Sequence, residues 1–176
     1  MKKLRIGLDI DDTICSFTRG YLKRFKKWPK HDWAITRNVE NILKHERDFW
    51  INLEIINVPD FRPRLYCSSR VNSRRWTREF LRRNNLPSSP LYQIPGYKIS
   101  KADVLKGKVD VFIDDSIHNF IDLNSKGVPC LLMNSDFNKE WKFGGRIYSL
   151  KYNEIINEYN DFIKNIFPNF ISYLND

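Results

Sequence analysis

Cysteine is scarce in this sequence, and long uninterrupted apolar runs are absent from it. The three cysteines, Cys15, Cys67 and Cys130, are widely spaced and lie in or beside apolar stretches. An odd, scattered set indicates reduced thiols and argues against a disulfide framework or a zinc site. No window approaches the roughly 18 apolar residues of a membrane-spanning helix, and the N-terminal segment lacks the apolar core of a signal peptide. We therefore expect a soluble, cytoplasmic protein with no membrane partner.

Apolar and aromatic residues are plentiful. Of the 176 residues 41% are hydrophobic, and they include 12 Phe, 8 Tyr and 5 Trp. This composition can build a substantial core and argues against disorder. A chain of this length suits one domain with room for a modest insertion.

The net charge of +9 indicates an anionic partner, such as a nucleotide, a nucleic acid or a phosphorylated metabolite. Much of the positive charge lies in two patches, residues 19–30 and 70–83. These patches are also compatible with ordinary solvated helix faces, and charge alone does not choose between the two interpretations.

Short apolar segments alternate with amphipathic ones along the chain. We expect strands near residues 4–10, 65–67, 91–94, 109–113, 129–133 and 146–148. We expect helices near residues 16–27, 38–50, 73–84, 101–106, 116–125 and 152–174. The last helix should kink or end at Pro168 and should pack on the sheet rather than form an oligomer contact. The alternation predicts a three-layer, Rossmann-like α/β fold with a mainly parallel sheet, whose strand C-termini lie along one edge.

Two of the expected strands end in acidic clusters. The first is followed by Asp9, Asp11 and Asp12, and the fourth by the pair Asp114 and Asp115. Carboxylates at the C-terminal ends of parallel strands lie where open α/β sheets bind ligands. Their mutual repulsion predicts a divalent cation, and oxygen-only ligands favour Mg²⁺ over zinc. The alternative for the first cluster is a polar turn after an edge strand.

In combination these residues resemble the motifs of the haloacid dehalogenase (HAD) superfamily of phosphotransferases. The resemblance covers residues 4 to about 135 in order and spacing, and response-regulator receivers, which use similar residues, place them in a different order. The matching positions are Asp9, Asp11 and Thr13 in the first motif, Ser68 in the second, Lys101 or Lys98 in the third, and Asp114 with Asp115 in the fourth.

The resemblance implies a role for each of these side chains. Asp9 would be the nucleophile that forms an aspartyl-phosphate, and Asp11 the general acid and base. The Mg²⁺ ligands would be Asp9, Asp11 through its backbone carbonyl, Asp114, and Asp115 through water. The transferring phosphoryl group would be held by Ser68, Ser69, Lys101 and Lys98. The two lysines compete for one role. Ser69 is equally suited to capping the helix that follows.

In such proteins a cap inserted after the first motif sets the substrate. Here the cap would span residues 16–58, with residues 1–15 and 59–176 forming the core domain. Residues 49–53 and 66–69 resemble the corresponding stretches of 5′(3′)-deoxyribonucleotidases and related phage or bacterial nucleotidase-like proteins, whose cap aromatics stack on a base. The candidates for this stacking are Trp28, Trp33, Phe49 and Trp50, and core packing within the cap is an equal alternative for each.

The sequence departs from that pattern in two places. Residues 54–64 are too short and too rich in proline for the helix that usually follows the cap, and Arg70 stands where proline is frequent. A trimmed cap predicts an open site. We thus expect a Mg²⁺-dependent phosphomonoesterase acting on a small nucleotide-like substrate. The alternatives are a polynucleotide-end phosphatase and a non-catalytic nucleic-acid-binding or regulatory module, while the oligomeric state is left open.

Overall fold

The computed structural model describes residues 3–28, 32–94, 99–142 and 144–173, and it confirms the predicted α/β fold. Six strands form one sheet in the order β3-β2-β1-β4-β5-β6, and all five pairings are parallel. Each strand lies within or near a segment predicted from its apolar residues. The strands are β1 (Ile6–Leu8), β2 (Leu65–Ser68), β3 (Leu91–Gln93), β4 (Val111–Asp114), β5 (Cys130–Met133) and β6 (Arg146–Ile147).

Strand β1 lies at the centre of the sheet, and its three residues are buried. Gly7 has no room for a side chain, because a Cβ atom there would lie 2.8 Å from the Phe112 ring. From β1 the chain builds outward to β2 and β3, and it then returns to the other side for β4, β5 and β6. The order therefore reverses between β1 and β4, and ligands of open α/β sheets bind beside such a switch point.

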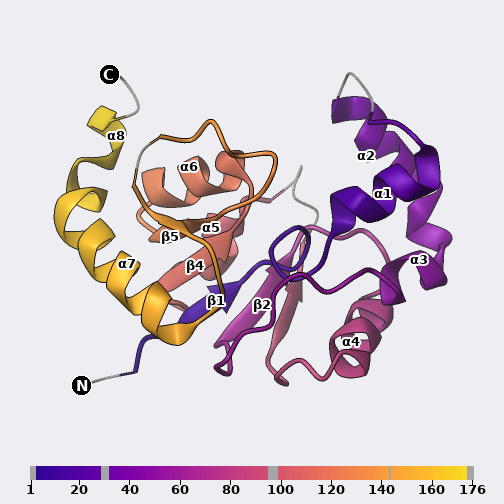
Figure 1. The fold of residues 1–176 in the computed structure, drawn as a ribbon, viewed down its shortest axis with the longest axis horizontal. Helices are drawn as coiled ribbons and strands as arrows, with labels where there is room; N and C mark the ends of the chain where they lie inside the picture. Colours follow the sequence, from indigo (N-terminus) through magenta and orange to yellow (C-terminus); the bar gives the residue numbers. More distant parts are fainter. Residues whose placement is uncertain (1–2, 29–31, 95–98, 143, 174–176) are drawn as a thin grey trace.

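The helices lie on both sides of the sheet, with α1–α4 to the right and α5–α8 to the left in Figure 1. This gives the three layers expected for alternating strands and helices. The helices are α1 (Phe17–Phe25), α2 (Asp32–Asn41), α3 (Arg47–Ile51), α4 (Arg74–Arg83), α5 (Lys101–Leu105), α6 (Ile117–Ser125), α7 (Tyr152–Asn165) and α8 (Phe170–Tyr173), with 3-10 turns η1 (Leu43–His45) and η2 (Phe167–Asn169).

The single helix predicted for residues 38–50 is wrong. Helix α2 ends at Asn41, and α3 begins only at Arg47 after the turn η1. The break buries Leu43 and Trp50 together, and the Trp50 indole N–H donates to the Leu43 carbonyl at 2.7 Å. Ile42, which the predicted helix placed among its apolar residues, is instead exposed. Burial and a satisfied indole N–H outweigh the local helical pattern here.

The predicted end of the last helix is confirmed. Helix α7 stops at Asn165, and Pro168 lies within η2, which leads into α8. The bulky side chains of this segment pack toward the sheet side, with Phe162 and Phe170 both near the Phe120 ring of α6. The tail therefore covers the core, as predicted.

Residues 16–58 contribute α1, α2, η1 and α3 but none of the six strands. The segment leaves and rejoins the core at neighbouring points, because the Ser16 N–H donates to the Glu54 carbonyl and the Ile56 N–H to the Ile14 carbonyl, at 2.9 and 2.8 Å. Its aromatic interior includes the buried rings of Tyr21 and Trp50.

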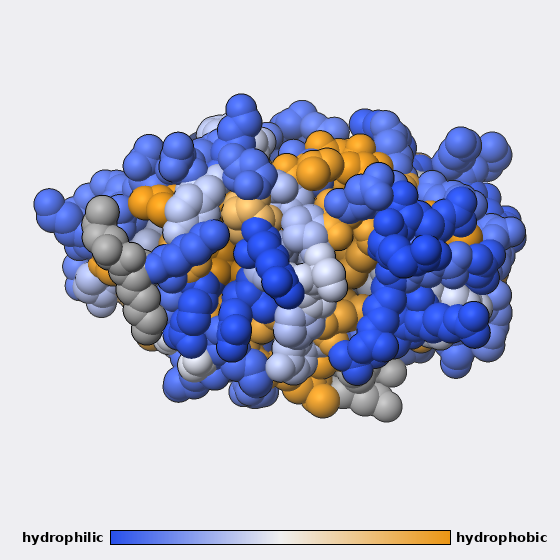
Figure 2. Space-filling model, turned by 90° about the horizontal axis from the view of Figure 1, so that it is seen from below, coloured by the Kyte–Doolittle hydropathy of each residue, from blue (hydrophilic) through white to orange (hydrophobic). Residues whose placement is uncertain are grey.

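The surface is mainly hydrophilic, with apolar residues visible only in patches between hydrophilic ones in the view of Figure 2. Within the described part of the chain, every helix is too short or too polar to cross a lipid bilayer.

Candidate active site

Three carboxylates meet at the C-terminal ends of β1 and β4. The parallel register pairs Leu8 with Ile113, and the Asp9 N–H donates to the Ile113 carbonyl at 2.9 Å. Asp9, directly after β1, therefore lies beside Asp114, the last residue of β4. Asp9, Asp114 and Asp115 each offer a carboxylate oxygen, and these atoms lie within 4.8 Å of one another. Asp9 and Asp114 are only 5% and 1% exposed. The strand-end placement predicted from the sequence thus brings both acidic motifs together.

Lys101 lies between two of these carboxylates. Its Nζ atom is 2.5 Å from Asp9 Oδ1 and 2.7 Å from Asp114 Oδ2. Lys101 is the first residue of α5, and the side chain of Ser100 caps that helix by accepting the Ala102 N–H. Of the two lysines considered from the sequence, Lys101 therefore reaches the site, while Lys98 lies outside the described residues.

When its three carboxyl groups are ionised, the cluster carries more negative than positive charge. Burial, followed by repulsion from Asp114 and Asp11, raises the pKa of Asp9 to about 8, although Lys101 opposes this shift. Burial, followed by repulsion from Asp114, Asp9 and Asp12, raises the pKa of Asp115 well above its ordinary value. Burial disfavours the Lys101 ammonium, but Asp114 and Asp9 outweigh it and raise the pKa of Lys101. Lys101 thus provides the positive charge beside three closely spaced carboxyl groups, two of which it contacts.

This donor set fits a hard divalent cation. All three side chains offer oxygen ligands, which suit Mg²⁺ and do not favour zinc. A second positive charge would offset the repulsion that Lys101 alone leaves uncompensated. The Asp11 carboxylate is not part of the three-carboxylate cluster, and the sequence-based expectation for Asp11 involves only its backbone carbonyl.

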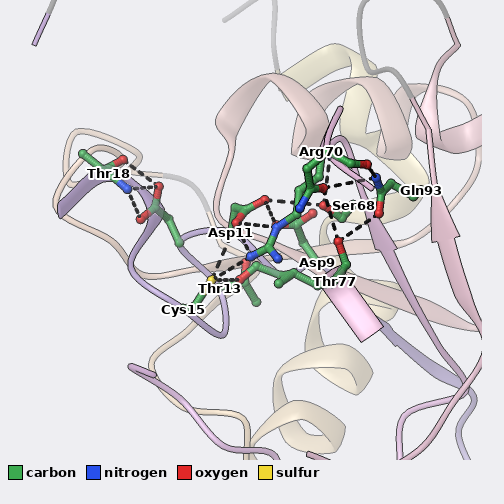
Figure 3. A network of polar contacts seen from close by, with 12 residues as sticks. Asp9, Asp11, Thr13, Cys15, Thr18, Ser68, Arg70, Thr77 and Gln93 are labelled. Carbon is green, nitrogen blue, oxygen red and sulfur yellow. Dashed lines mark hydrogen bonds and ion pairs between the residues drawn. The ribbon is translucent and has the colours of Figure 1, made fainter. Parts of the chain in front are cut away.

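Asp11 instead faces Arg70 (Figure 3). Arg70 Nη2 lies 2.7 Å from Asp11 Oδ1, and Arg70 Nε lies 3.0 Å from both carboxylate oxygens. The Ser68 hydroxyl donates to Asp11 Oδ2 at a longer 3.4 Å. The general acid and base implied by the resemblance is therefore fixed in place by a charged, two-pronged contact.

Arg70 is itself deeply buried. Its guanidinium lies 5.1 Å from the ring centroids of Trp50 and of Phe80, and its Nη2 contacts the Cys15 sulfur at 3.2 Å. Burial disfavours the cation, yet Asp11 and Cys15 keep the pKa of Arg70 above its ordinary value. The sequence marked Arg70 only as a departure from the nucleotidase pattern. Its aromatic and acidic partners come from elements distant in sequence, so local analysis could not find them.

The two serines of the second motif differ. Ser68 is buried at the end of β2, and its hydroxyl accepts the Arg70 N–H at 3.2 Å. Ser69 is exposed. Neither caps the following helix, because α4 begins at Arg74 and its N-cap residue is Ser73.

Asp12 and Thr13 belong to the turn that follows β1. Asp12 adopts a positive φ of 55°, and its carboxylate accepts the backbone N–H of Thr18 at 3.0 Å and the Thr18 hydroxyl at 2.6 Å. Asp12 thus caps the start of α1, a role that the sequence analysis did not assign. Its partner lies six residues on, outside the usual capping spacing. Thr13 is buried, and its hydroxyl lies 3.5 Å from Asp115 Oδ1.

Asn119 was also missed by the sequence analysis. Its side-chain Nδ2 lies 3.1 and 3.0 Å from the two oxygens of Asp114, and the Ser116 N–H donates to Asp114 Oδ1 at 3.0 Å. Both residues lie at the start of α6, directly after the acidic pair. Asn119 could have been identified from its position, because it is an amide in the first turn of a helix that directly follows an acidic strand end.

The four aromatic residues proposed for base stacking do not form one surface. Trp50 is 1% exposed and belongs to the core, and Phe49 is half-buried with its ring edge-on to Trp50. Trp28 is 39% exposed and stacks on Phe137, with centroids 5.9 Å apart. The side chain of Trp33 lies outside the described residues. Among the three of these four side chains that the structure describes, Trp28 is the most exposed.

A comparison with models of known protein families finds no match to this chain, and no curated protein matches it either.

Proposed function

We propose that this protein is a Mg²⁺-dependent phosphomonoesterase that acts through an aspartyl-phosphate on Asp9, with a nucleotide-like substrate. One observation carries the proposal. Asp9, Asp114 and Asp115 converge within 4.8 Å at the switch point of a parallel sheet, and a buried lysine bridges two of them. Structural packing alone gives no reason to gather three carboxylates around one ammonium, because buried charges destabilise a fold unless they are fully paired.

The proposed reaction has two displacements. A carboxylate oxygen of Asp9 attacks phosphorus and the bond from phosphorus to the leaving oxygen breaks. Asp11, which must enter this step in its protonated form, gives its proton to that oxygen. Water then attacks the aspartyl-phosphate, Asp11 accepts its proton, and the Asp9 carboxylate is released with inorganic phosphate. Splitting one displacement into two is the usual advantage of a covalent nucleophile.

The remaining residues position these groups. Lys101 supplies a positive charge beside Asp9 for the phosphoryl oxygens, and the Ser68 hydroxyl offers a hydrogen bond close to Asp11. Asp9, Asp114 and Asp115 would hold Mg²⁺, which when bound neutralises charge on the transferring group. Asn119 fixes the Asp114 carboxylate, and Arg70 fixes that of Asp11.

A nucleotide-like substrate is favoured by a hollow of about 390 Å³ beside the turn that holds Asp12. It is lined by the exposed rings of Phe137 and Tyr148, by the amides Asn57 and Asn134, and by Arg19. Aromatic faces, amide groups and a guanidinium are the side chains that contact a base and a phosphorylated sugar.

Phosphate release from nucleoside monophosphates tests the proposal. With Mg²⁺ present we expect turnover that EDTA abolishes, and Asp9→Asn should reduce kcat about 10⁴-fold or more because the nucleophile is lost. Asp161→Asn, which removes an exposed carboxylate of helix α7 that does not line this hollow, is the matched control and should retain activity. Turnover that survives Asp9→Asn, or no release from any monophosphate, would refute the assignment.

A further inference from the structure

Helix α4 presents a row of arginines that have no acidic partner among the residues the structure describes. The helix contains five arginines and one acidic residue, Glu79. Arg75, Arg78 and Arg82 recur at intervals of three and four residues, so they share one face. All three are exposed, and across the described residues none has a side-chain hydrogen bond or an ion pair.

The single acid of this helix is already occupied. Glu79 is paired with Arg47 of α3, whose Nε lies 3.2 Å from Glu79 Oε2 and whose Nη2 contacts Oε1. This pair joins α3 to α4, and within the described ranges Arg75, Arg78 and Arg82 have no ion pair. Solvated helix faces usually alternate the two signs of charge, and this face does not.

The arginine row borders a hollow of about 520 Å³. The hollow is lined by Arg47, Arg75, Trp76, Arg78, Glu79 and Arg82. Figure 2 shows strongly hydrophilic residues gathered on the right-hand part of the molecule, the side on which α4 lies in Figure 1. The surface thus combines guanidinium groups with a half-buried indole in one concavity.

We propose that this surface, formed by Arg75, Trp76, Arg78 and Arg82, binds single-stranded nucleic acid. Guanidinium groups suit phosphate oxygens because their planar donors match that geometry. Three arginines along about two turns of helix can follow the successive phosphates of one strand, and the chain's net charge of +9 favours such a polyanion. The indole of Trp76 offers a stacking face, which only an unpaired base can reach.

The test is fluorescence anisotropy with a labelled single-stranded oligonucleotide that lacks terminal phosphates, in EDTA. Without a terminal phosphate or Mg²⁺ the measurement is independent of the phosphatase proposal, so either can fail alone. The variant Arg75→Gln/Arg78→Gln/Arg82→Gln should bind on the order of 10- to 100-fold more weakly at low salt. The magnitude of its slope of log affinity against log salt concentration should fall by about 2, because a protein that makes fewer phosphate contacts releases fewer counterions on binding.

A charge-matched control separates this surface from net charge. Lys142→Gln/Lys151→Gln/Lys164→Gln removes the same number of exposed cations from the C-terminal part of the chain and should bind within about twofold of the native protein. Both triple variants should keep the native Tm within a few degrees, because the substituted α4 side chains make no ion pairs in the described structure.

Trp76→Leu adds a second, independent measure. It should weaken binding without changing the salt slope, because stacking releases no counterions. Equal binding by the two triple variants would overturn the proposal, as would tighter binding to double-stranded than to single-stranded oligonucleotide. Preferential capture by anionic vesicles or acidic peptides would also overturn it.

Discussion

Two ion-paired clusters lie at the rim of the sheet, and they differ in how completely their charges are matched. At the β1–β4 junction one lysine meets three carboxylates, of which it contacts two. At the β1–β2 junction Arg70 meets the single carboxylate of Asp11 and lies near the rings of Trp50 and Phe80. The first cluster retains negative charge that a ligand can satisfy, whereas the second is balanced by the protein itself.

The difference separates binding from positioning. A cluster with unmatched charge is unstable by itself and gains free energy when a cation binds, by linkage between binding and folding. A matched pair gains nothing from a cation and is suited to holding a side chain in one orientation. We therefore propose that the Asp9, Asp114 and Asp115 cluster binds the cation, while Arg70 holds the side chain of Asp11 in place.

Replacing Lys101 should produce the largest change in stability. Lys101→Met leaves three carboxylates without their ammonium, and we expect a loss of about 4 kcal/mol in the free energy of unfolding in EDTA at pH 8. Mg²⁺ should restore part of this loss, because it binds only the folded cluster. Urea unfolding with EDTA and with Mg²⁺ measures both quantities. An equal loss under the two conditions would contradict the cation site.

Removing Arg70 should be slightly less costly and should not respond to Mg²⁺. Arg70→Met leaves Asp11 unpaired, so we expect the free energy of unfolding to fall by about 3 kcal/mol with or without Mg²⁺. Arg70→Lys, which keeps the charge but loses the two-pronged contact, should retain more stability and still lower kcat. Rescue of Arg70→Met by Mg²⁺ would show that the two clusters are not separate.

The affinity for Mg²⁺ should depend on pH. The pKa of Asp9 is raised to about 8, so below that pH the folded cluster retains a proton that a cation must displace. The apparent Kd for Mg²⁺ should therefore fall about fivefold from pH 7 to pH 8 and about twofold more by pH 9, where it levels off. Isothermal titration calorimetry in buffers of different ionisation enthalpy would also detect the released proton. A constant Kd across this pH range would contradict the expectation that a proton on Asp9 competes with the cation.

Asp12 should give the smallest effect. Burial raises its pKa to about 6 from 3.8, so the folded state holds the proton more tightly, and stability declines as pH rises from about 4 to 6. Asn tolerates the positive φ and retains an acceptor for Thr18. A shift of this size corresponds to about 3 kcal/mol, but the amide accepts the Thr18 hydrogen bonds more weakly than a carboxylate does, so we expect Asp12→Asn to be only about 1 kcal/mol more stable than the native protein at pH 8 and equal to it at pH 4, in EDTA. Thermal unfolding at the two pH values checks this, and a variant destabilised at pH 8 would disprove it.

The sheet and its acidic rim were predictable because their signals are local. Short apolar runs define strands such as β1 and β4, and parallel connections bring Asp9 and Asp114 to the same edge. The partners of these acids were less accessible. Arg70 reaches Asp11 across 59 residues, and the interaction depends on rings supplied by α3 and α4. The helix break after Asn41 likewise depends on a tertiary contact between Leu43 and Trp50.

The helical segment 16–58 enters and leaves the core through adjacent backbone hydrogen bonds, from Ser16 to Glu54 and from Ile56 to Ile14. Because these two connections are already held together, a replacement of quite different length can be closed between them at little entropic cost. The strand-end carboxylates and the helical segment are thus encoded in separable stretches of gene. Evolution, or a protein engineer, can change the length of this segment while the carboxylates stay in place, provided that the Trp50 ring beside Arg70 is kept.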